Sequence, residues 1–352
     1  MSNDVLAEPV DWPPLWEITL GDCPTALAWD PSGSRLAAAS LAGDVVVAET
    51  ADGSQQQVSF HNGGALCLDW AGARLVSGGQ DGTATIDGDR IELGGWVSAL
   101  TSSQSGQHVA VGHGRSVSVL DVASGATLSS ERHNTTVTGV CWHPTYHDVV
   151  RSGSFERIAQ QQIGVAAALP DIELEFGGAI AAVGVAASTG RTVAGVRGDF
   201  AYLWHDAAMS QPILVPTGPW AGELFCFSSG GELLATASPR MTAVFEFAPD
   251  NPLGMPSGKW LTSIGKPTAI AWQPDTDRLC SAVTIGSDVD DNGILVWEPR
   301  RSPTPIGFVK TRGRVEQMVW QADGDLLAVA FADGTVGVGH LDVGTGASLD
   351  SA

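Results

Sequence analysis

The chain has 352 residues, of which 43% are apolar and 16% are charged. This composition excludes a disordered chain, and the length is sufficient to bury roughly 75% of the unfolded surface. The 39 acidic and 18 basic residues give a formal net charge of −21, which repels polyphosphates and anionic lipids. Nucleic acid and membranes are therefore not expected partners.

Cysteine usage and the N-terminal sequence predict the compartment. The five cysteines are an odd number and contain no C-x-x-C pair, so they do not form a disulfide framework. The first residues carry acids and prolines where a secretory signal has a basic segment and an apolar core. No run of eighteen apolar residues occurs. We expect a soluble, cytoplasmic protein.

In chain order, residues 1–14 are expected to be flexible and Leu15–Leu20 to form a strand. Thereafter a unit of strand, turn and strand recurs, with short Val, Leu, Ala and Thr runs between scattered glycines and prolines. Such self-similarity indicates a repeat architecture. The eight units begin at Thr25, Ala65, Ser98, Thr138, Ala181, Glu223, Ala269 and Glu316.

The first strand of each unit has a small residue at one aligned position, flanked mostly by larger apolar residues. Apolar residues on both sides of the strand predict that both of its faces are buried, as in the innermost strand of a radially packed sheet. The small positions are Ala28, Cys67, Thr101, Cys141, Gly184, Cys226, Ala271 and Val319.

A third strand follows a turn in most units, and a more polar fourth strand leads into the next unit. Four strands at a period near 40 residues predict one propeller blade per repeat. The predicted third strands start at Gly43, Asp81, Arg115, Asp199, Asn292 and Asp333. In the fourth unit this strand is polar, and Gln160, Gln161 and Gln162 need hydrogen-bond partners if buried. That blade is either irregular or a contact surface.

With these units in place, residues 15–342 resemble the WD-repeat β-propeller family, in a degenerate, stand-alone bacterial-type form. The motif that names the family is present as variants at Trp204-His205, Trp297-Glu298 and Leu120-Asp121. The resemblance implies an all-β fold, a single β-propeller of four-stranded blades closed when the N-terminal strand pairs beside Thr335–His340. Eight blades are favoured, with seven as the alternative. Residues 343–352 are expected to form a disordered tail.

The family resemblance also gives His61 and His133 a role. In WD repeats a histidine before the first strand is tied to an aspartate in the turn before the third strand. Asp81 is the corresponding partner of His61, with Ser77 between them. This implies a structural hydrogen-bond network and not a catalytic one.

Other chemistry-bearing residues are interpreted as structural. Cys67, Cys141 and Cys226 lie in the small-residue positions and are expected to pack as small hydrophobes. His143, His147 and Asp148 have metal-ligand types, but Pro144 places them in a turn without helical spacing. A weak calcium candidate consists of Asp288, Asp290 and Asn292, which lacks the closing carboxylate and is interpreted as an acidic hairpin. No metal or other cofactor is expected.

The turns before the third strands emerge on one face of a propeller. Arginine and aromatic side chains are favoured at protein interfaces because they combine contact area with forked hydrogen bonding. The predicted partner-binding residues on this face are His113, Arg115, Phe155, Arg197, Arg240 and Met241. The alternative is that these loops carry arginine for solubility.

The sequence therefore favours a non-catalytic protein-interaction scaffold, which presents loop surfaces to protein partners. No phosphate loop, dinucleotide fingerprint or nucleophile elbow is present. The alternative is a propeller that binds or transforms a small ligand in its central channel. A cluster of titratable side chains in the channel would favour that alternative.

Overall fold

The structure is a computed structural model, and its described part is all-β. No described residue belongs to a helix that could cross a membrane. The residues described are 10–143, 146–155, 157–163, 172–175, 180–185, 191–196, 200–205, 212–216, 224–239, 241–247, 256–286 and 292–343.

Within these residues the strands form eight sheets, each built on an antiparallel meander; six consist of four strands in chain order, the seventh has a fifth strand at its edge, and the eighth takes its fourth strand from near the N-terminus. The first sheet contains β3 (Pro24–Trp29), β4 (Arg35–Ser40), β5 (Asp44–Glu49) and β6 (Gln55–Phe60). The second contains β7 (Ala65–Ala71), β8 (Arg74–Gly79), β9 (Thr83–Ile86) and β10 (Asp89–Glu92). The third contains β11 (Val97–Ser102), β12 (His108–His113), β13 (Ser116–Asp121) and β14 (Thr127–Arg132). The fourth contains β15 (Val137–Trp142), β16 (Val149–Ser154), β17 (Arg157–Gln162) and β18 (Ile172–Glu175).

The second half of the chain repeats this plan. The fifth sheet contains β19 (Ile180–Val185), β20 (Arg191–Val196), β21 (Phe200–His205) and β22 (Ile213–Pro216). The sixth contains β23 (Leu224–Phe227), β24 (Leu233–Ser238), β25 (Met241–Glu246) and β26 (Ser257–Leu261). The seventh contains β27 (Lys266–Trp272), β28 (Leu279–Thr284), β29 (Asn292–Trp297) and β30 (Gly307–Lys310), with β1 (Val10–Asp11) added at its edge. The eighth contains β31 (Val315–Trp320), β32 (Leu327–Phe331), β33 (Thr335–Gly339) and β2 (Trp16–Thr19).

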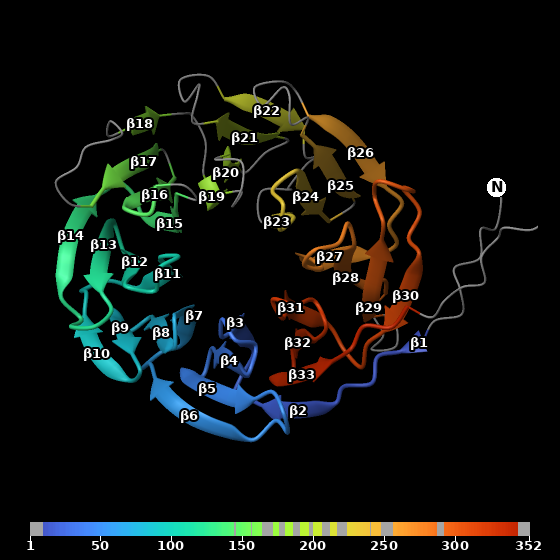
Figure 1. Ribbon diagram of the computed structural model, residues 1–352, viewed down its shortest axis with the longest axis horizontal. Helices are drawn as coiled ribbons and strands as arrows, with labels where there is room; N and C mark the ends of the chain where they lie inside the picture. Colours follow the sequence, from blue (N-terminus) through green and yellow to red (C-terminus); the bar gives the residue numbers. More distant parts are fainter. Residues whose placement is uncertain are drawn as a thin grey trace, which may run out of the picture.

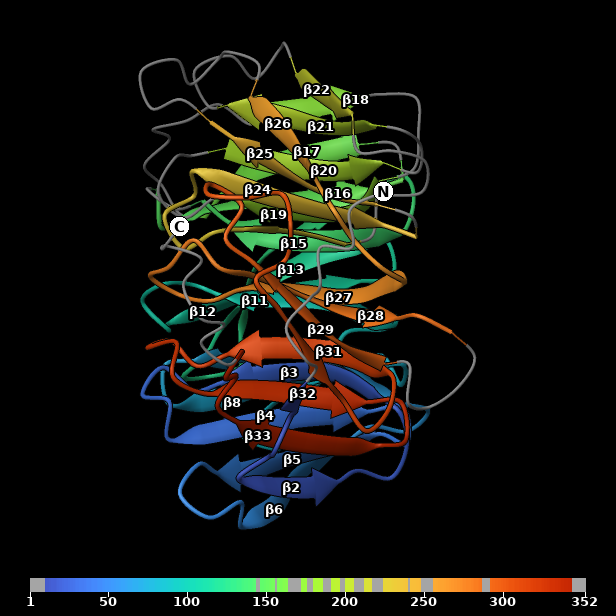
Figure 2. The same cartoon turned by 90° about the vertical axis from the view of Figure 1, so that its right-hand side faces the viewer.

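The sheets follow one another around a common centre, with the first strand of each sheet innermost and the fourth outermost (Figure 1). Figure 2 shows the same arrangement from the side. Inner strands of neighbouring sheets lie against each other, as β3 does with both β7 and β31. The predicted all-β class and four-stranded repeat are confirmed, and they fit a β-propeller-like repeat fold.

Strands from near the two ends of the chain pair in the eighth sheet. The expected pairing of the N-terminal strand with the last third strand is confirmed, since β2 pairs antiparallel with β33 from Trp16–Val338 to Thr19–Thr335. The flexible segment expected over residues 1–14 is wrong for residues 10–14, because β1 pairs with β30 and Trp12 is buried. Its indole N–H donates to the carbonyl of His340. Val343, expected in a disordered tail, packs against the same core cluster, while residues 344–352 lie outside the described part.

A repeated tryptophan contact connects neighbouring sheets. Near the end of several inner strands, an indole N–H donates to a main-chain carbonyl on the inner strand of the preceding sheet. The acceptor residues are positions of the small-residue column, so the small side chains allow the indole to approach. The pairs are Trp29 to Val319 (3.1 Å), Trp70 to Ala28 (3.0 Å), Trp142 to Thr101 (2.8 Å) and Trp272 to Cys226 (3.1 Å).

The expectation that both faces of the inner strands are buried is wrong. Most side chains of β3 and all of those of β23 are partly exposed, whereas the second strands β4 and β24 are buried almost throughout. The inner strands line the middle of the molecule, and no element covers that side in Figure 1. The apolar cores therefore lie between the sheets, around the second and third strands.

The polar third strand of the fourth sheet is accommodated by cross-strand pairing. Gln160 is buried opposite Arg151, whose Nε donates to Gln160 Oε1 at 2.9 Å. Gln162 donates to Asp148, and Gln161 Nε2 has no partner among the described residues. The strand pairing in this sheet is regular, and the sheet includes a buried polar pair beside buried apolar residues such as Val150 and Ile158.

Candidate functional site

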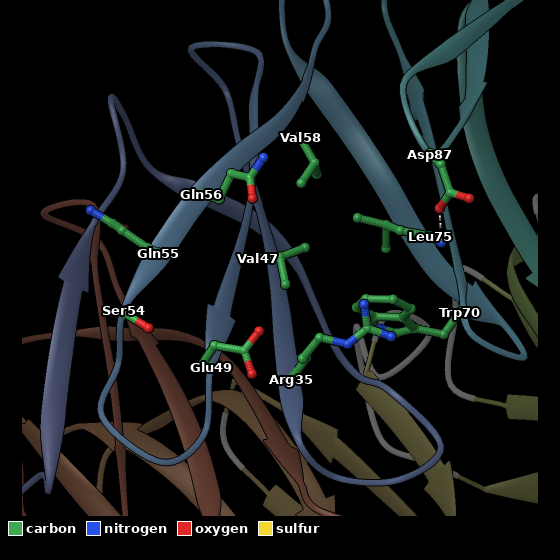
Figure 3. A pocket seen from close by; sticks show the side chains of 10 residues that line it. All are labelled: Arg35, Val47, Glu49, Ser54, Gln55, Gln56, Val58, Trp70, Leu75 and Asp87. Carbon is green, nitrogen blue, oxygen red and sulfur yellow. Dashed lines mark hydrogen bonds between the residues drawn. The ribbon is translucent and has the colours of Figure 1, made fainter.

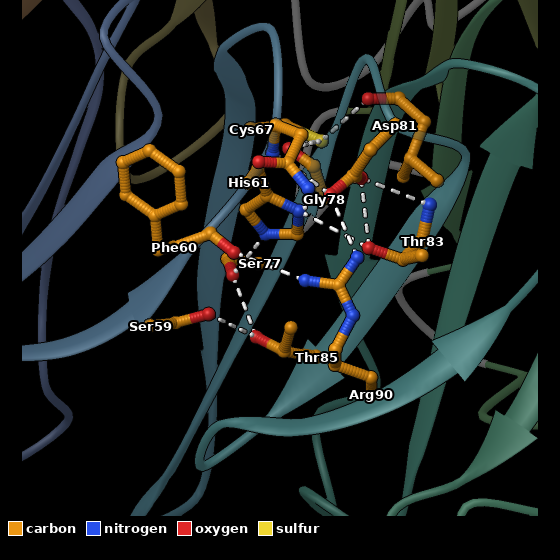
Figure 4. A network of polar contacts seen from close by, with 12 residues as sticks. Ser59, Phe60, His61, Cys67, Ser77, Gly78, Asp81, Thr83, Thr85 and Arg90 are labelled. Atoms are coloured by element: carbon orange, nitrogen blue, oxygen red, sulfur yellow. Dashed lines mark hydrogen bonds and ion pairs between the residues drawn. The ribbon is translucent and has the colours of Figure 1, made fainter.

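The best-defined polar constellation surrounds His61, in the link between β6 and β7 (Figure 4). His61 Nε2 lies 2.8 Å from Ser77 Oγ, and His61 Nδ1 lies 3.1 Å from Asp81 Oδ1. The network predicted from these three residues is confirmed. Thr83 Oγ1 and Arg90 Nη2 donate to the same carboxylate at 2.7 and 2.9 Å.

The order serine, histidine, aspartate is also that of a nucleophilic triad, so access decides its role. His61 is 0% and Ser77 1% exposed, so no substrate reaches the serine oxygen. Ser77 Oγ additionally lies 2.7 Å from Thr85 Oγ1, which holds the hydroxyl within the sheet. The constellation joins β7–β10 to the preceding link and is structural.

His133 occupies the corresponding link before the fourth sheet. Its Nε2 lies 2.9 Å from Ser152 Oγ, and Ser152 corresponds to Ser77 in the strand register. Nδ1 has no partner among the described residues, and position 156, the counterpart of Asp81, lies outside them. Burial, with the charge of Arg157 as a smaller cause, lowers the pKa of His133 to about 4. His133 is therefore a neutral, buried side chain at pH 7.

The remaining candidates for chemistry are inert or fall outside the described part. All five cysteines are free thiols, and burial raises the pKa of Cys67, Cys141, Cys226 and Cys280 to about 12. Asp288 and Asp290 lie outside the described residues, while Asn292 is buried and accepts a hydrogen bond from Thr284 Oγ1 at 2.9 Å. No group of three metal-ligand side chains occurs in the described part of the chain.

The six residues predicted to bind a partner differ in how far their side chains are exposed. His113 is buried with Nε2 2.9 Å from Ser118 Oγ, so it is not available to a partner. Met241 is half-buried, whereas Arg115 and Phe155 are exposed, Phe155 to 43%. Arg197 and Arg240 lie outside the described residues.

Two residues that sequence reasoning missed lie beside Arg115. Trp96 is 60% exposed, and its carbonyl accepts the N–H of Gly114, the residue before Arg115. Arg132 is exposed and pairs in register with Ser116, the residue after Arg115. The Gly94-Gly95 turn before an aromatic residue is the only sequence signal that could have indicated Trp96. We call Trp96, Arg115 and Arg132 the arginine–tryptophan surface.

This surface differs in charge from the rest of the described molecule. Arg115 and Arg132 have no carboxylate partner among the described residues. Most other arginines whose side chains are described contact an acidic group, namely Arg35, Arg74, Arg90, Arg157, Arg278, Arg300, Arg301, Arg312 and Arg314. On a chain of net charge −21, two exposed arginines without a carboxylate partner among the described residues, whose main chain lies near that of the exposed Trp96, are available to an acidic ligand.

Comparison with known proteins gives a fold and no function. No family model and no curated protein matches this sequence. Among solved structures, the chain is similar to the crystal structure of the computationally designed Ika8 protein, with a TM-score of 0.70 and 17% sequence identity. The similarity covers 92% of this chain and 98% of the designed one. At this identity the likeness is one of fold alone, so function must be argued from the side chains.

Proposed function

We propose that this chain is a non-catalytic protein-interaction scaffold of the WD-repeat type. In this proposal the eight sheets are the blades of one β-propeller, whose ring is closed by β2 in the last blade. The loops present surfaces to protein partners, and the arginine–tryptophan surface binds an acidic segment of a partner. The observation that carries the proposal is the pair of exposed arginines, Arg115 and Arg132, that have no carboxylate partner in the described part of the chain and whose main chain lies near that of Trp96.

The energetics of such a surface favour protein binding. An exposed tryptophan provides a large contact area with little loss of side-chain entropy, and arginine binds carboxylates through two parallel hydrogen bonds. The main chain next to Phe155 is linked to that next to Arg115 through Val137, which pairs with Ser154 and donates its N–H to Gly114. In this proposal the exposed Phe155 contributes to the same partner contact as Arg115.

A ligand-transforming channel receives less support. On the inner strands whose side chains are described, the carboxylates are Asp69 and Glu316 and the only amine is Lys266. Burial raises the pKa of Asp69, but its oxygens accept the main-chain N–H groups of Ser102 and Trp70. Glu316 is paired with Arg314. These residues form no cluster of titratable groups of the kind that an enzyme site needs.

The same proposal places the protein in the cytoplasm, and the free thiols support a reducing compartment.

The proposal is tested by affinity capture from the native cytoplasm, with the tagged chain and its Trp96→Ala/Arg115→Ala/Arg132→Ala variant. Fluorescent glutamate-rich peptides measure the same binding directly. We expect a stoichiometric protein partner, and peptide binding that weakens at least tenfold in the variant and with increasing salt. A control, Arg301→Ala, removes an exposed arginine that is already paired with Glu298. Equal binding by the variant and the native chain would refute the role of this surface.

A further inference from the structure

A groove lies between the first and second sheets, and its lining includes no residue of the arginine–tryptophan surface (Figure 3). It has a volume of about 360 Å³, which is within the range of ligand pockets. Val47 and Val58 of the first sheet line one side, and Trp70 and Leu75 of the second sheet line the other. Its polar lining consists of Arg35, Glu49, Ser54, Gln55, Gln56 and Asp87.

The charges that line the groove are neutralised with one exception. Arg35 Nε lies 3.3 Å from Asp30 Oδ2, and its guanidinium covers the Trp70 ring at 4.4 Å. Asp87 Oδ2 lies 2.7 Å from Arg74 Nε. Glu49 is exposed, and its carboxylate has no hydrogen bond or ion pair among the described residues. The groove therefore combines apolar walls with one unpaired negative charge.

The equivalent place between the sixth and seventh sheets identifies what such a carboxylate binds. Glu246 is the last residue of β25 and pairs with Leu233, as Glu49 is the last residue of β5 and pairs with Arg35. Arg300, from the loop between β29 and β30, reaches this position with Nε 2.9 Å from Glu246 Oε1. The same guanidinium contacts Glu232 at 2.7 Å and Asp277 at 3.0 Å. In the sixth sheet the carboxylate is thus satisfied by an arginine of the next sheet.

Within the described part of the chain, the groove beside Glu49 has no corresponding arginine, because the loop between the third and fourth strands of the second sheet is short. The second sheet connects β9 to β10 by the two-residue turn Asp87-Gly88, in place of the longer loop that carries Arg300. Both turn residues have positive φ angles, 50° and 91°, as a tight hairpin requires. The turn leaves the space beside Glu49 open.

We propose that this groove binds an arginine side chain from a protein partner. The guanidinium pairs with Glu49 as Arg300 pairs with Glu246, and its aliphatic stem packs on Val47 and Val58. The strongly negative chain attracts a basic segment, which provides charge complementarity. This site is independent of the arginine–tryptophan surface and takes a partner segment of opposite charge.

The test uses a fluorescent peptide, acetyl-Leu-Leu-Arg-Leu-amide, with fluorescence anisotropy on the full chain. The matched control peptide carries citrulline, which keeps the shape of arginine without its charge. We expect saturable binding of the arginine peptide that weakens at least tenfold in Glu49→Gln and with the citrulline peptide. Glu92→Gln, which removes another exposed glutamate without an ion pair, is expected to bind as the native chain does. Equal binding by Glu49→Gln or by the citrulline peptide would overturn the proposal.

A second variant tests the comparison between Glu49 and Glu246. Arg300→Ala leaves Glu246 unpaired, so combining it with Glu49→Gln should restore binding of the arginine peptide at the sixth sheet. If the double variant binds no better than Glu49→Gln alone, a partner arginine does not substitute for Arg300, and the inference is wrong. Because these peptides carry no acidic group, failure here leaves the acidic-segment proposal separately testable.

Discussion

His61 and His133 occupy the same position before two different sheets, yet among the described residues only His61 has a partner at each ring nitrogen. His61 is bonded through both ring nitrogens and shares Asp81 with Thr83 and Arg90. The one partner of His133 within the described part of the chain is Ser152, and the register places Arg157 where the second sheet has Thr83. The difference shows that one buried imidazole can serve either as the centre of a polar network or as a neutral filler.

The largest expected effect is that of removing His61. His61→Ala leaves Ser77, Asp81 and Thr83 without a shared partner inside the protein, and we expect it to lower the free energy of unfolding by about 4 kcal/mol. His133→Ala removes the hydrogen-bond partner of one hydroxyl, that of Ser152, and should lower the free energy of unfolding by about 2 kcal/mol. Urea unfolding at pH 7 measures both. Equal losses would contradict the distinction between the two histidines.

The next effect depends on pH and is the contribution of His133 to the pH dependence, to which the buried His113, whose pKa burial also lowers, adds separately. Its folded pKa of about 4 lies below the ordinary histidine value of about 6.5, so the unfolded chain binds the proton more tightly. The free energy of unfolding should therefore fall by about 3 kcal/mol as the pH decreases from 6.5 to 4. His133→Gln should remove this part of the pH dependence, whereas His147→Gln, at an exposed histidine, should not. An unchanged slope in His133→Gln would refute the assignment.

Asp81 is expected to have a smaller effect with a different pH range. Burial acts to raise its pKa, but hydrogen bonds from Thr83, His61 and Arg90 outweigh burial and hold the pKa well below the usual range. The carboxylate therefore contributes stability above about pH 4, which is lost as the pH falls further. Asp81→Asn should cost about 2 kcal/mol at pH 7 and progressively less in acid, with Asp89→Asn as the exposed control. A loss independent of pH would exclude the ionised carboxylate as its source.

The smallest effect is that of Thr85, whose counterpart in the fourth sheet is Ala159. Thr85→Ala removes the hydroxyl 2.7 Å from Ser77 Oγ and should cost about 1 kcal/mol. In a His61→Ala background the cost should be smaller, because the network is already broken. A double-mutant cycle measures this coupling, and strict additivity would show that Thr85 is not part of the network.

The sequence was informative where a contact is set by strand register. The contact of His61 with Asp81 and Ser77 was expected from the resemblance to WD repeats, and the strand register of one hairpin and its link brings the three residues together. The exposure of β3 and β23 was not, because an apolar strand looks the same whether its inner face meets another layer or an open centre. Trp96 and Arg132 were missed because exposure and the lack of a carboxylate partner depend on neighbouring sheets. The free Glu49 was missed for the same reason, since the loop that could neutralise it belongs to the next repeat.

The pairing of β2 with β33 in the eighth sheet affects how the protein folds during synthesis. The indole of Trp29 and its acceptor Val319 are 290 residues apart. The strand β2 has no pairing partner until β33 has been synthesised. While the ribosome is still translating, the early strands Trp16–Thr19 and Pro24–Trp29 lack these neighbours and expose unpaired edges. Contacts this distant in sequence slow folding, so the final assembly step occurs only after nearly the whole chain has been released.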